Sequence, residues 1–167
     1  LHSAQYVQCA QLLSKPNKSG EFCKSLVEKI SKEFKKIDLI LSPAMGGIVI
    51  GYEIGRLLMK ETIFSERVDG QFKLRRDFKI IKNSKVLIVE DVITTGKSSI
   101  ECSKLVEIAE ADLIGFACLI DRSSGNSLMN KKIISQIKIT IPTYKKDSLP
   151  ENLIALPAIK PGSREIK

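Results

Sequence analysis

The chain has 167 residues, of which 43% are hydrophobic and 28% charged, and its formal net charge is +8 at pH 7. The hydrophobic share excludes a disordered chain, the length predicts a single domain over residues 1–167, and no apolar run approaches the ~20 residues of a membrane span. The basic balance is compatible with nucleic acid, a membrane surface or a polyanionic small substrate, but the scattered lysines favour a solvated surface and argue against a nucleic-acid partner.

The cysteines and the single histidine carry little chemistry. The four cysteines are Cys9, Cys23, Cys102 and Cys118. They form no Cys-x-x-Cys pair, so their spacing argues against a metal site and a disulfide framework. Reduced cysteines and the lack of a signal-peptide pattern indicate the cytoplasm. His2 lies at a terminus that we expect to fray, and the absence of a methionine at position 1 predicts that the natural N-terminus lies upstream.

The first third of the chain predicts two helices around one strand. Residues 16–20 are rich in turn formers and predict a turn. Apolar residues then recur every four positions, which is typical of one face of an amphipathic helix; they are Phe22, Leu26, Ile30 and Phe34. Residues 37–41 predict a strand, and residues 42–47 predict a glycine-containing turn. The spacing of the apolar positions in residues 48–58 predicts a second helix.

The middle of the chain predicts a basic hairpin. Two β-like runs, 62–67 and 72–80, flank residues 68–71, in which Asp69-Gly70 is a good two-residue hairpin turn. We expect these runs to form an arm of about residues 62–81. Arg67, Lys73, Arg75 and Arg76 make this arm locally basic.

The second half alternates strands with a helix. Residues 86–89 predict a strand buried on both faces, residues 96–109 a helix, and residues 113–120 and 133–141 two further strands. The tail from Pro142 is expected to be irregular. Strands that alternate with helices predict an α/β fold, an open, mostly parallel twisted sheet flanked by helices, with an inserted β-hairpin.

Three loops follow predicted strands, near residues 42–47, 90–98 and 121–125. Because the carboxyl ends of parallel strands meet at one edge of a sheet, we expect these loops to form the ligand site. In the middle loop, the acids Glu90 and Asp91 precede a small hydroxyl-rich turn that opens a helix. Free N–H groups at a helix N-terminus suit a phosphate, and the acids beside them suit ribose hydroxyls.

A purely structural interpretation is a buried strand followed by a capped helix. Two adjacent acids repel each other unless a positive or hydroxylated group lies between them, which argues against that interpretation.

Residues 86–98 resemble the motif that binds 5-phosphoribosyl 1-pyrophosphate (PRPP) in type I phosphoribosyltransferases, at all thirteen positions. The resemblance covers most of the chain and implies the fold of that family, in which the hairpin is a hood arm.

Within this family the chain is most similar to the orotate phosphoribosyltransferases. The stretches that carry this similarity are residues 1–8, 42–47, 64–78, 121–122 and 157–163. The resemblance implies transfer of 5-phosphoribosyl from PRPP to N1 of orotate, which yields orotidine 5′-phosphate and pyrophosphate in pyrimidine biosynthesis. It also implies a homodimer, because the arm usually completes the neighbouring subunit's site in this family.

The resemblance also assigns roles to individual residues. The PRPP-binding residues would be Arg67, Glu90, Asp91, Val92, Ile93, Thr94, Thr95, Gly96, Lys97 and Ser98. Asp91, Arg67 and Lys73 would be catalytic. The arm lacks a histidine, and Gln71 stands where a lysine is usual, so the catalytic cation is either Lys73 or Arg67. The family's Mg²⁺ would be held mainly by PRPP near Asp91, without direct protein ligands.

Thr94 and Arg122 are the expected orotate-binding residues. A bidentate guanidinium at Arg122 suits the carboxylate of orotate, whereas the alternative is a surface arginine that pairs with Asp121. Thr94 is a neutral hydroxyl where the 6-oxopurine enzymes carry an acid. Two other functions stay open: a PRPP-binding regulatory protein on the same fold, and a phosphoribosyltransferase for another nucleobase.

Overall fold

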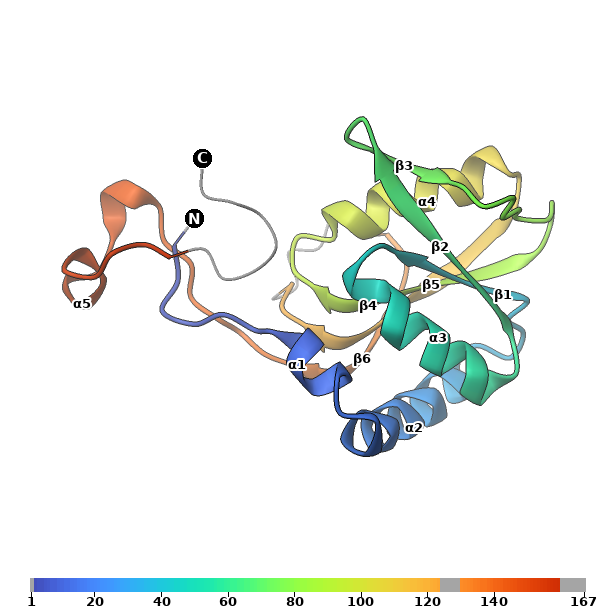
Figure 1. Cartoon of the computed structure of the whole chain (residues 1–167), viewed down its shortest axis with the longest axis horizontal. Helices are drawn as coiled ribbons and strands as arrows, with labels where there is room; N and C mark the ends of the chain where they lie inside the picture. Colours follow the sequence, from blue (N-terminus) through green and yellow to red (C-terminus); the bar gives the residue numbers. More distant parts are fainter. Residues whose placement is uncertain (1, 124–129, 160–167) are drawn as a thin grey trace.

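A six-stranded sheet in the order β3-β2-β1-β4-β5-β6 forms the centre of the computed structural model, which describes residues 2–123 and 130–159 (Figure 1). Neighbouring strands are parallel except β2 and β3, which are antiparallel. The predicted α/β fold with an open, mostly parallel sheet is therefore confirmed. The strands are β1 (Leu39–Pro43), β2 (Glu61–Val68), β3 (Gln71–Leu74), β4 (Lys85–Ile93), β5 (Asp112–Asp121) and β6 (Ile133–Lys138).

Helices cover both faces of this sheet (Figure 1). One face is covered by α1 (Cys9–Leu13), α2 (Pro16–Glu33) and α3 (Gly46–Leu58), and the other by α4 (Lys97–Ile108). The 3-10 turn η1 (Lys146–Ser148) and α5 (Glu151–Ile154) follow β6, and α5 lies away from the sheet (Figure 1). Among the described residues no helix is long and apolar enough to span a bilayer.

Two apolar clusters lie on the two faces of the sheet, because side chains alternate along a strand. Leu87 and Val89 of β4 pack with α1, α2 and α3, whereas Val86 and Ile88 pack with α4. All four side chains are at most 1% exposed. The prediction that residues 86–89 form a strand buried on both faces is confirmed.

The predicted turn at residues 16–20 is wrong, because α2 begins at Pro16. Proline suits the first helical position, where its fixed φ is favourable and its missing N–H would have no partner in any case. The buried face of α2 also differs from the predicted one, since Phe22 is 38% exposed whereas Leu26 and Ile30 are fully buried beside Cys23.

Several strand boundaries differ from the prediction. β1 ends at Pro43, two residues later than expected, and α3 begins at Gly46, so only residues 44–45 connect them. β6 ends at Lys138 instead of at residue 141. β4 runs through Glu90 and Asp91 to Ile93, so the acids are its sixth and seventh residues instead of following its end.

The arm is shorter than the predicted 62–81. The first half of β2 pairs in parallel with β1, from Leu39↔Glu61 to Pro43↔Ser65, so it belongs to the sheet. The projecting hairpin turns at Asp69 and Gly70, whose φ angles of 52° and 79° are those that a two-residue hairpin turn requires. β3 ends at Leu74, and the predicted strand to residue 80 is wrong.

The two ends of the described chain lie side by side and extend from the body of the molecule (Figure 1). His2 and Tyr144 exchange two backbone hydrogen bonds of 2.8 Å, and the Ser3 hydroxyl donates to the Pro142 carbonyl at 2.9 Å. His2 is thus paired, and the expectation of a frayed end is wrong. Residues 1, 124–125 and 160–163, which the sequence arguments included, lie outside the described residues.

Candidate functional site

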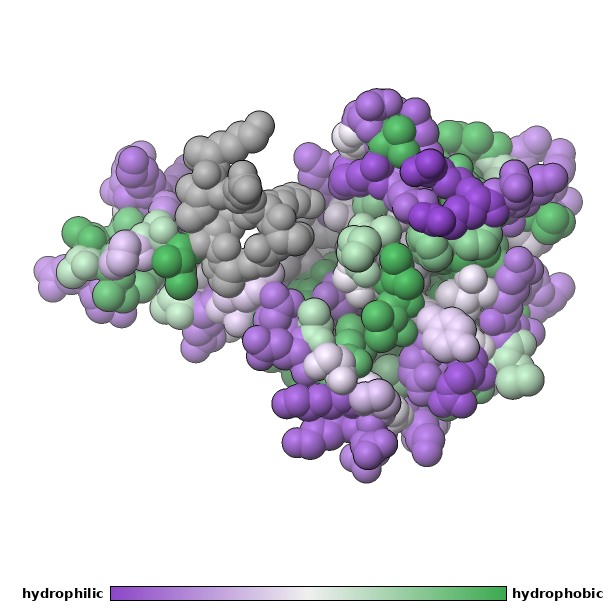
Figure 2. Space-filling model, viewed as in Figure 1, coloured by the Kyte–Doolittle hydropathy of each residue, from purple (hydrophilic) through white to green (hydrophobic). Residues whose placement is uncertain are grey.

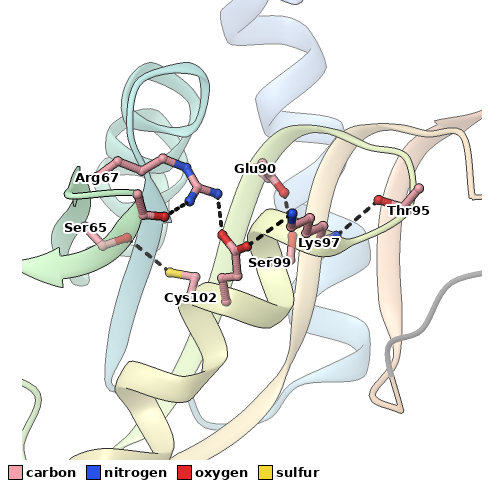
Figure 3. Close-up of polar contacts among 9 residues, drawn as sticks. Ser65, Arg67, Glu90, Thr95, Lys97, Ser99 and Cys102 are labelled. Atoms are coloured by element: carbon pink, nitrogen blue, oxygen red, sulfur yellow. Dashed lines mark hydrogen bonds and ion pairs between the residues drawn. The ribbon is translucent and has the colours of Figure 1, made fainter. Parts of the chain in front are cut away.

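A cavity of about 540 Å³ lies at the carboxyl edge of the sheet, between the end of β4, the start of α4 and the hairpin (Figure 3). Its lining residues are Arg67, Glu90, Val92, Thr94, Thr95, Gly96, Lys97 and Ser98. The structure therefore brings together eight of the ten residues that were predicted to bind PRPP. The other two, Asp91 and Ile93, do not line the cavity, and Ile93 is buried in the apolar cluster beneath α4.

The turn before α4 presents a helix N-terminus to the cavity. Gly96 precedes the first helical residue with a φ of 76°, a conformation that glycine adopts without strain. No side chain caps this helix end, and the hydroxyl of Thr95 accepts only a long bond, 3.4 Å, from the Lys97 N–H. The first N–H groups and the positive end of the helix dipole are thus available to an anion.

Glu90 enters the cavity from β4. The hydroxyl of Ser99 in α4 donates a hydrogen bond to its carboxylate, with 2.5 Å between Ser99 Oγ and Glu90 Oε2. Burial raises the pKa of Glu90 to about 7; the Ser99 hydrogen bond opposes this rise, the charge of Asp91 adds to it, and Arg67 opposes it. Glu90 is therefore a carboxyl group that gains or loses its proton near neutral pH.

Asp91 leaves β4 on the opposite face, toward the first residue of α3. A Cβ built on Gly46 would lie 2.8 Å from Asp91 Oδ1, so a larger residue at this position would displace the carboxylate from its present place. The N–H of Val92 donates to Oδ1 at 2.9 Å, and burial raises the pKa of Asp91. The two acids thus lie on either side of the strand instead of side by side.

Arg67 is held over the cavity by three neighbours. Its guanidinium donates to the Gly70 carbonyl at 2.6 Å, pairs with Glu101 of α4 and lies 4.2 Å from the ring centroid of Phe72. Lys73 is not brought to the cavity: its Nζ lies 4.0 Å from Asp69 Oδ2 at the tip of the hairpin. The structure therefore separates the two candidate cations.

The base of the hairpin is also fixed to α4. The Ser65 hydroxyl and the Cys102 thiol, both buried, lie 3.3 Å apart (Figure 3). Burial raises the pKa of Cys102 to about 12, so this thiol stays neutral. The contact ties β2 to the helix that begins at the cavity.

Arg122 follows β5, beside the end of β4. Its N–H donates to the Ile93 carbonyl at 2.8 Å, whereas its side-chain Nε is buried without a hydrogen-bond partner among the described residues. The carboxylate of Asp121 instead accepts a hydrogen bond from the Ser123 N–H at 2.9 Å, and its Oδ2 lies 4.0 Å from Lys138 Nζ. Within the described residues, the alternative pairing of Arg122 with Asp121 is therefore wrong.

Sequence analysis missed Ser99 and Glu101, which contact Glu90 and Arg67 respectively. Both follow the last position of the motif, at Ser98, and only the spacing of α4 against β4 and β2 reveals them. The described residues also contain no group of three or more His, Cys, Asp or Glu side chains that could hold a metal ion.

Comparisons with known proteins agree on one family. The model of the phosphoribosyl transferase domain matches residues 11–148. An orotate phosphoribosyltransferase of Parvibaculum lavamentivorans is 47% identical over 99% of this chain and 86% of its own length. A protein of the same name from Sphingopyxis alaskensis is 45% identical over 99% of this chain and 85% of its own length.

Solved structures have the same fold. The adenine phosphoribosyltransferase of Thermoanaerobacter pseudethanolicus has a TM-score of 0.69 at 20% identity and covers 80% of this chain and 88% of its own. The orotate phosphoribosyltransferase of Aeropyrum pernix has a TM-score of 0.69 at 18% identity and covers 80% of this chain and 78% of its own. At such identities the likeness concerns the fold alone.

Proposed function

This chain belongs to the phosphoribosyl transferase family, among its orotate phosphoribosyltransferases, and we propose that it transfers 5-phosphoribosyl from PRPP to N1 of orotate in pyrimidine biosynthesis. The observation that carries this proposal is the cavity in which Arg67 and Glu90 face an uncapped helix N-terminus. A cation, a carboxylate and a phosphate-binding turn in one cavity match the three parts of PRPP: pyrophosphate, ribose and 5′-phosphate.

The 5′-phosphate binds at the turn before α4. The N–H groups of residues 95–97 donate to it, and the hydroxyls of Thr94, Thr95 and Ser98 complete its shell. The positive end of the helix dipole favours the dianion. The turn fixes the sugar at one end, which places the remaining groups of PRPP along the cavity.

Glu90 and Asp91 hold the ribose hydroxyls. During the transfer the anomeric carbon becomes oxocarbenium-like while pyrophosphate departs, so the protein contributes mainly positioning and electrostatic stabilisation. A carboxylate that accepts a hydrogen bond from the ribose directs negative charge at the reacting sugar. Asp91 approaches from the α3 face of β4, so the sugar would lie across the end of the strand, between the two acids.

Arg67 binds the pyrophosphate. A guanidinium suits this anion because it forms two parallel hydrogen bonds with phosphate oxygens. Arg67 now pairs with Glu101, so it exchanges this carboxylate for pyrophosphate when PRPP enters. Lys73 is the second catalytic cation, and it reaches the cavity only if the hairpin tip moves toward α4, which closes the site to water.

Orotate binds beside Arg122 and Thr94. The buried Nε of Arg122 lacks a partner among the described residues, and a buried polar group without a hydrogen bond costs about 1–3 kcal/mol. The ring carboxylate of orotate supplies that partner, and the hydroxyl of Thr94 supplies a contact to the pyrimidine edge. Neither adenine nor hypoxanthine carries a carboxylate, so Arg122 favours orotate over these bases.

We propose that the reaction uses Mg²⁺, which would be held near Asp91 mainly by the oxygens of PRPP and would supply positive charge to offset that of pyrophosphate. The donor set fits the ion, because Mg²⁺ prefers carboxylate, phosphate and water oxygens and keeps several waters.

We also propose a cytoplasmic location, which the four free cysteines support.

The enzyme is a homodimer in which α3 packs against α3 of a second copy. Its solvent face carries an apolar stripe of Met45, Val49, Tyr52 and Met59, each at least 53% exposed. Figure 2 shows apolar side chains gathered over α3. Met45 and Met59 are equally distant from Tyr52 in sequence, so an antiparallel copy places each Met45 against Met59 of the other chain. Such a self-complementary face is what a twofold axis requires.

Loss of orotate absorbance in the ultraviolet tests the activity. The chain is incubated with PRPP and Mg²⁺, and uracil and hypoxanthine are run in parallel. We expect consumption of orotate alone. Consumption of another base would assign the chain to a different nucleobase, and PRPP binding without any turnover would favour the PRPP-binding regulator.

A further inference from the structure

Ser99 is a buried hydroxyl beside the cavity, one position beyond the PRPP motif. It is the third residue of α4 and is 0% exposed. Its hydroxyl donates to the Glu90 carboxylate at 2.5 Å (Figure 3). Among the residues that the structure describes, this is the one hydrogen bond that the carboxylate accepts.

Glu90 needs such a partner to hold one position. Its side chain has three rotatable bonds, and the charges nearest to it act in opposite directions, with Asp91 beside it in β4 and Arg67 across the cavity. A side chain bound by a short hydrogen bond to a rigid element stays in one rotamer, which is what a preorganised site requires.

Helix α4 is rigid enough to serve as that element. Cys102 and Val106 anchor it in the apolar cluster on this face of the sheet, and both are 0% exposed. The same helix begins at the phosphate-binding turn. A hydroxyl in its first turn therefore places the Glu90 carboxylate at a constant distance from the groups that bind the 5′-phosphate.

We propose that Ser99 is a positioning residue that holds the Glu90 carboxylate toward the ribose of PRPP. The inference rests on the proposed function, since it assumes that Glu90 binds a ribose hydroxyl. Ser99 itself touches no substrate. Its contribution is to deliver the carboxylate and the phosphate turn to PRPP as one preformed unit.

Ser99→Ala is the direct test. Because ribose is held both before and during the transfer, we expect the KM for PRPP to rise about tenfold while kcat stays within about twofold. Ser103→Ala is the matched control, because it removes a hydroxyl from the next turn of α4 that donates only to the Ile100 carbonyl, at 2.7 Å. The control should keep the wild-type KM.

A double-mutant cycle separates positioning from a merely structural role. If Ser99 acts through Glu90, Ser99→Ala has no further effect on PRPP affinity in a Glu90→Ala background, which leaves no acceptor for the Ser99 hydroxyl. If the two changes multiply, Ser99 acts independently of Glu90 and the inference is wrong. A second pair, Ser99→Thr and Ser99→Val, has nearly equal volume, so only the valine variant should lose PRPP affinity; equal loss in both would also overturn the inference.

Affinity for PRPP is measured by calorimetry without any base, which separates this inference from the proposed function. A wild-type chain that binds PRPP but consumes no orotate contradicts the proposed base, while the Ser99 variants still test the positioning role. A wild-type chain that does not bind PRPP contradicts both.

Discussion

Glu90 is a residue of the candidate site whose pKa lies near neutral pH. Burial raises its pKa from the ordinary value of 4.5 to about 7. The ionised carboxylate accepts the hydrogen bond from ribose, so PRPP affinity should fall by up to about tenfold per pH unit below 7. Calorimetric titrations between about pH 5 and 8 measure this slope, and Glu90→Gln should remove the part that Glu90 causes while it leaves the part due to the phosphate groups of PRPP, whose second pKa is about 6.

The stability of the ligand-free protein has the opposite pH dependence. A carboxyl group whose pKa is higher in the folded than in the unfolded chain favours folding in its neutral form. The contribution of Glu90 to the free energy of unfolding is complete below pH 4.5 and is lost as the pH rises through about 7. Chemical unfolding at a series of pH values measures this pH dependence of stability.

A PRPP affinity that did not change with pH in the wild type would contradict the role of Glu90 in binding.

Arg122 determines the choice of base in this account. Arg122→Ala removes the guanidinium whose Nε lacks a partner, and a charge-assisted hydrogen bond contributes roughly 1.5–3 kcal/mol. We expect orotate binding to weaken by about 10–100-fold and PRPP binding to stay unchanged. Separate KM values for orotate and PRPP in the Arg122→Ala variant test this expectation. An equal rise in both KM values would place Arg122 outside the base site.

At the scale of elements, α4 connects the phosphate turn, the acid of β4 and the hairpin. Its Glu101 pairs with Arg67, and the side chains are 27% and 32% exposed. Such a partly exposed pair contributes about 1 kcal/mol or less to stability. Its main effect is to restrain Arg67, and under the proposed function Arg67 exchanges Glu101 for pyrophosphate.

Glu101→Gln should therefore tighten PRPP binding by about 2–5-fold, because pyrophosphate no longer competes with a carboxylate for Arg67. The unfolding free energy should change by less than about 1 kcal/mol. Glu107→Gln, an exposed change of the same charge on the same helix, is the control. Weaker PRPP binding in Glu101→Gln would instead show that Glu101 orients Arg67 for catalysis.

Sequence patterns predict the elements better than they predict the contacts between them. The strand at residues 86–89 and the helix that follows were predicted because hydrophobic periodicity and a glycine at a helix start are local signals. The start of α2 at Pro16 was missed, since proline and glycine also form turns. The opposite faces of Glu90 and Asp91 were missed because the strand runs past them to Ile93.

The part of the site whose residues are adjacent in sequence was predicted from a local pattern, whereas Arg67 was predicted only through the family resemblance. The motif from Glu90 to Ser98 supplies most of the cavity. Ser99 and Glu101 take part through the packing of α4 against β4 and the hairpin, which no local pattern encodes. The separation of Lys73 from Arg67 likewise depends on which side of the hairpin faces α4.

At the scale of the whole molecule, the apolar stripe of α3 predicts the dimer. Tyr52→Glu places two carboxylates at the proposed twofold axis, and we expect monomers in sedimentation at micromolar concentration. Ile81→Glu is the control, since Ile81 is 68% exposed in the segment between β3 and β4, outside α3, and should leave the dimer intact. A dimer that tolerates Tyr52→Glu would place the interface elsewhere.

Arg67 lines the cavity of its own chain, whereas the family resemblance implies that the arm serves the neighbouring site. Mixing inactive Asp91→Ala and Arg67→Ala chains distinguishes the two arrangements. Sites completed within one chain give no activity after subunit exchange. Sites that share the arm recover about a quarter of the wild-type activity, because random exchange restores one complete site in half of the dimers.

Whether the cavity beside α4 binds PRPP is tested by titration of PRPP into the wild-type chain with Mg²⁺ present. We expect saturable binding at one PRPP per chain, with thermal stabilisation that is lost when Arg67 and Glu90 are replaced together by Ala and Gln. Absence of binding by the wild-type chain, or binding that the double variant retains in full, would contradict this expectation.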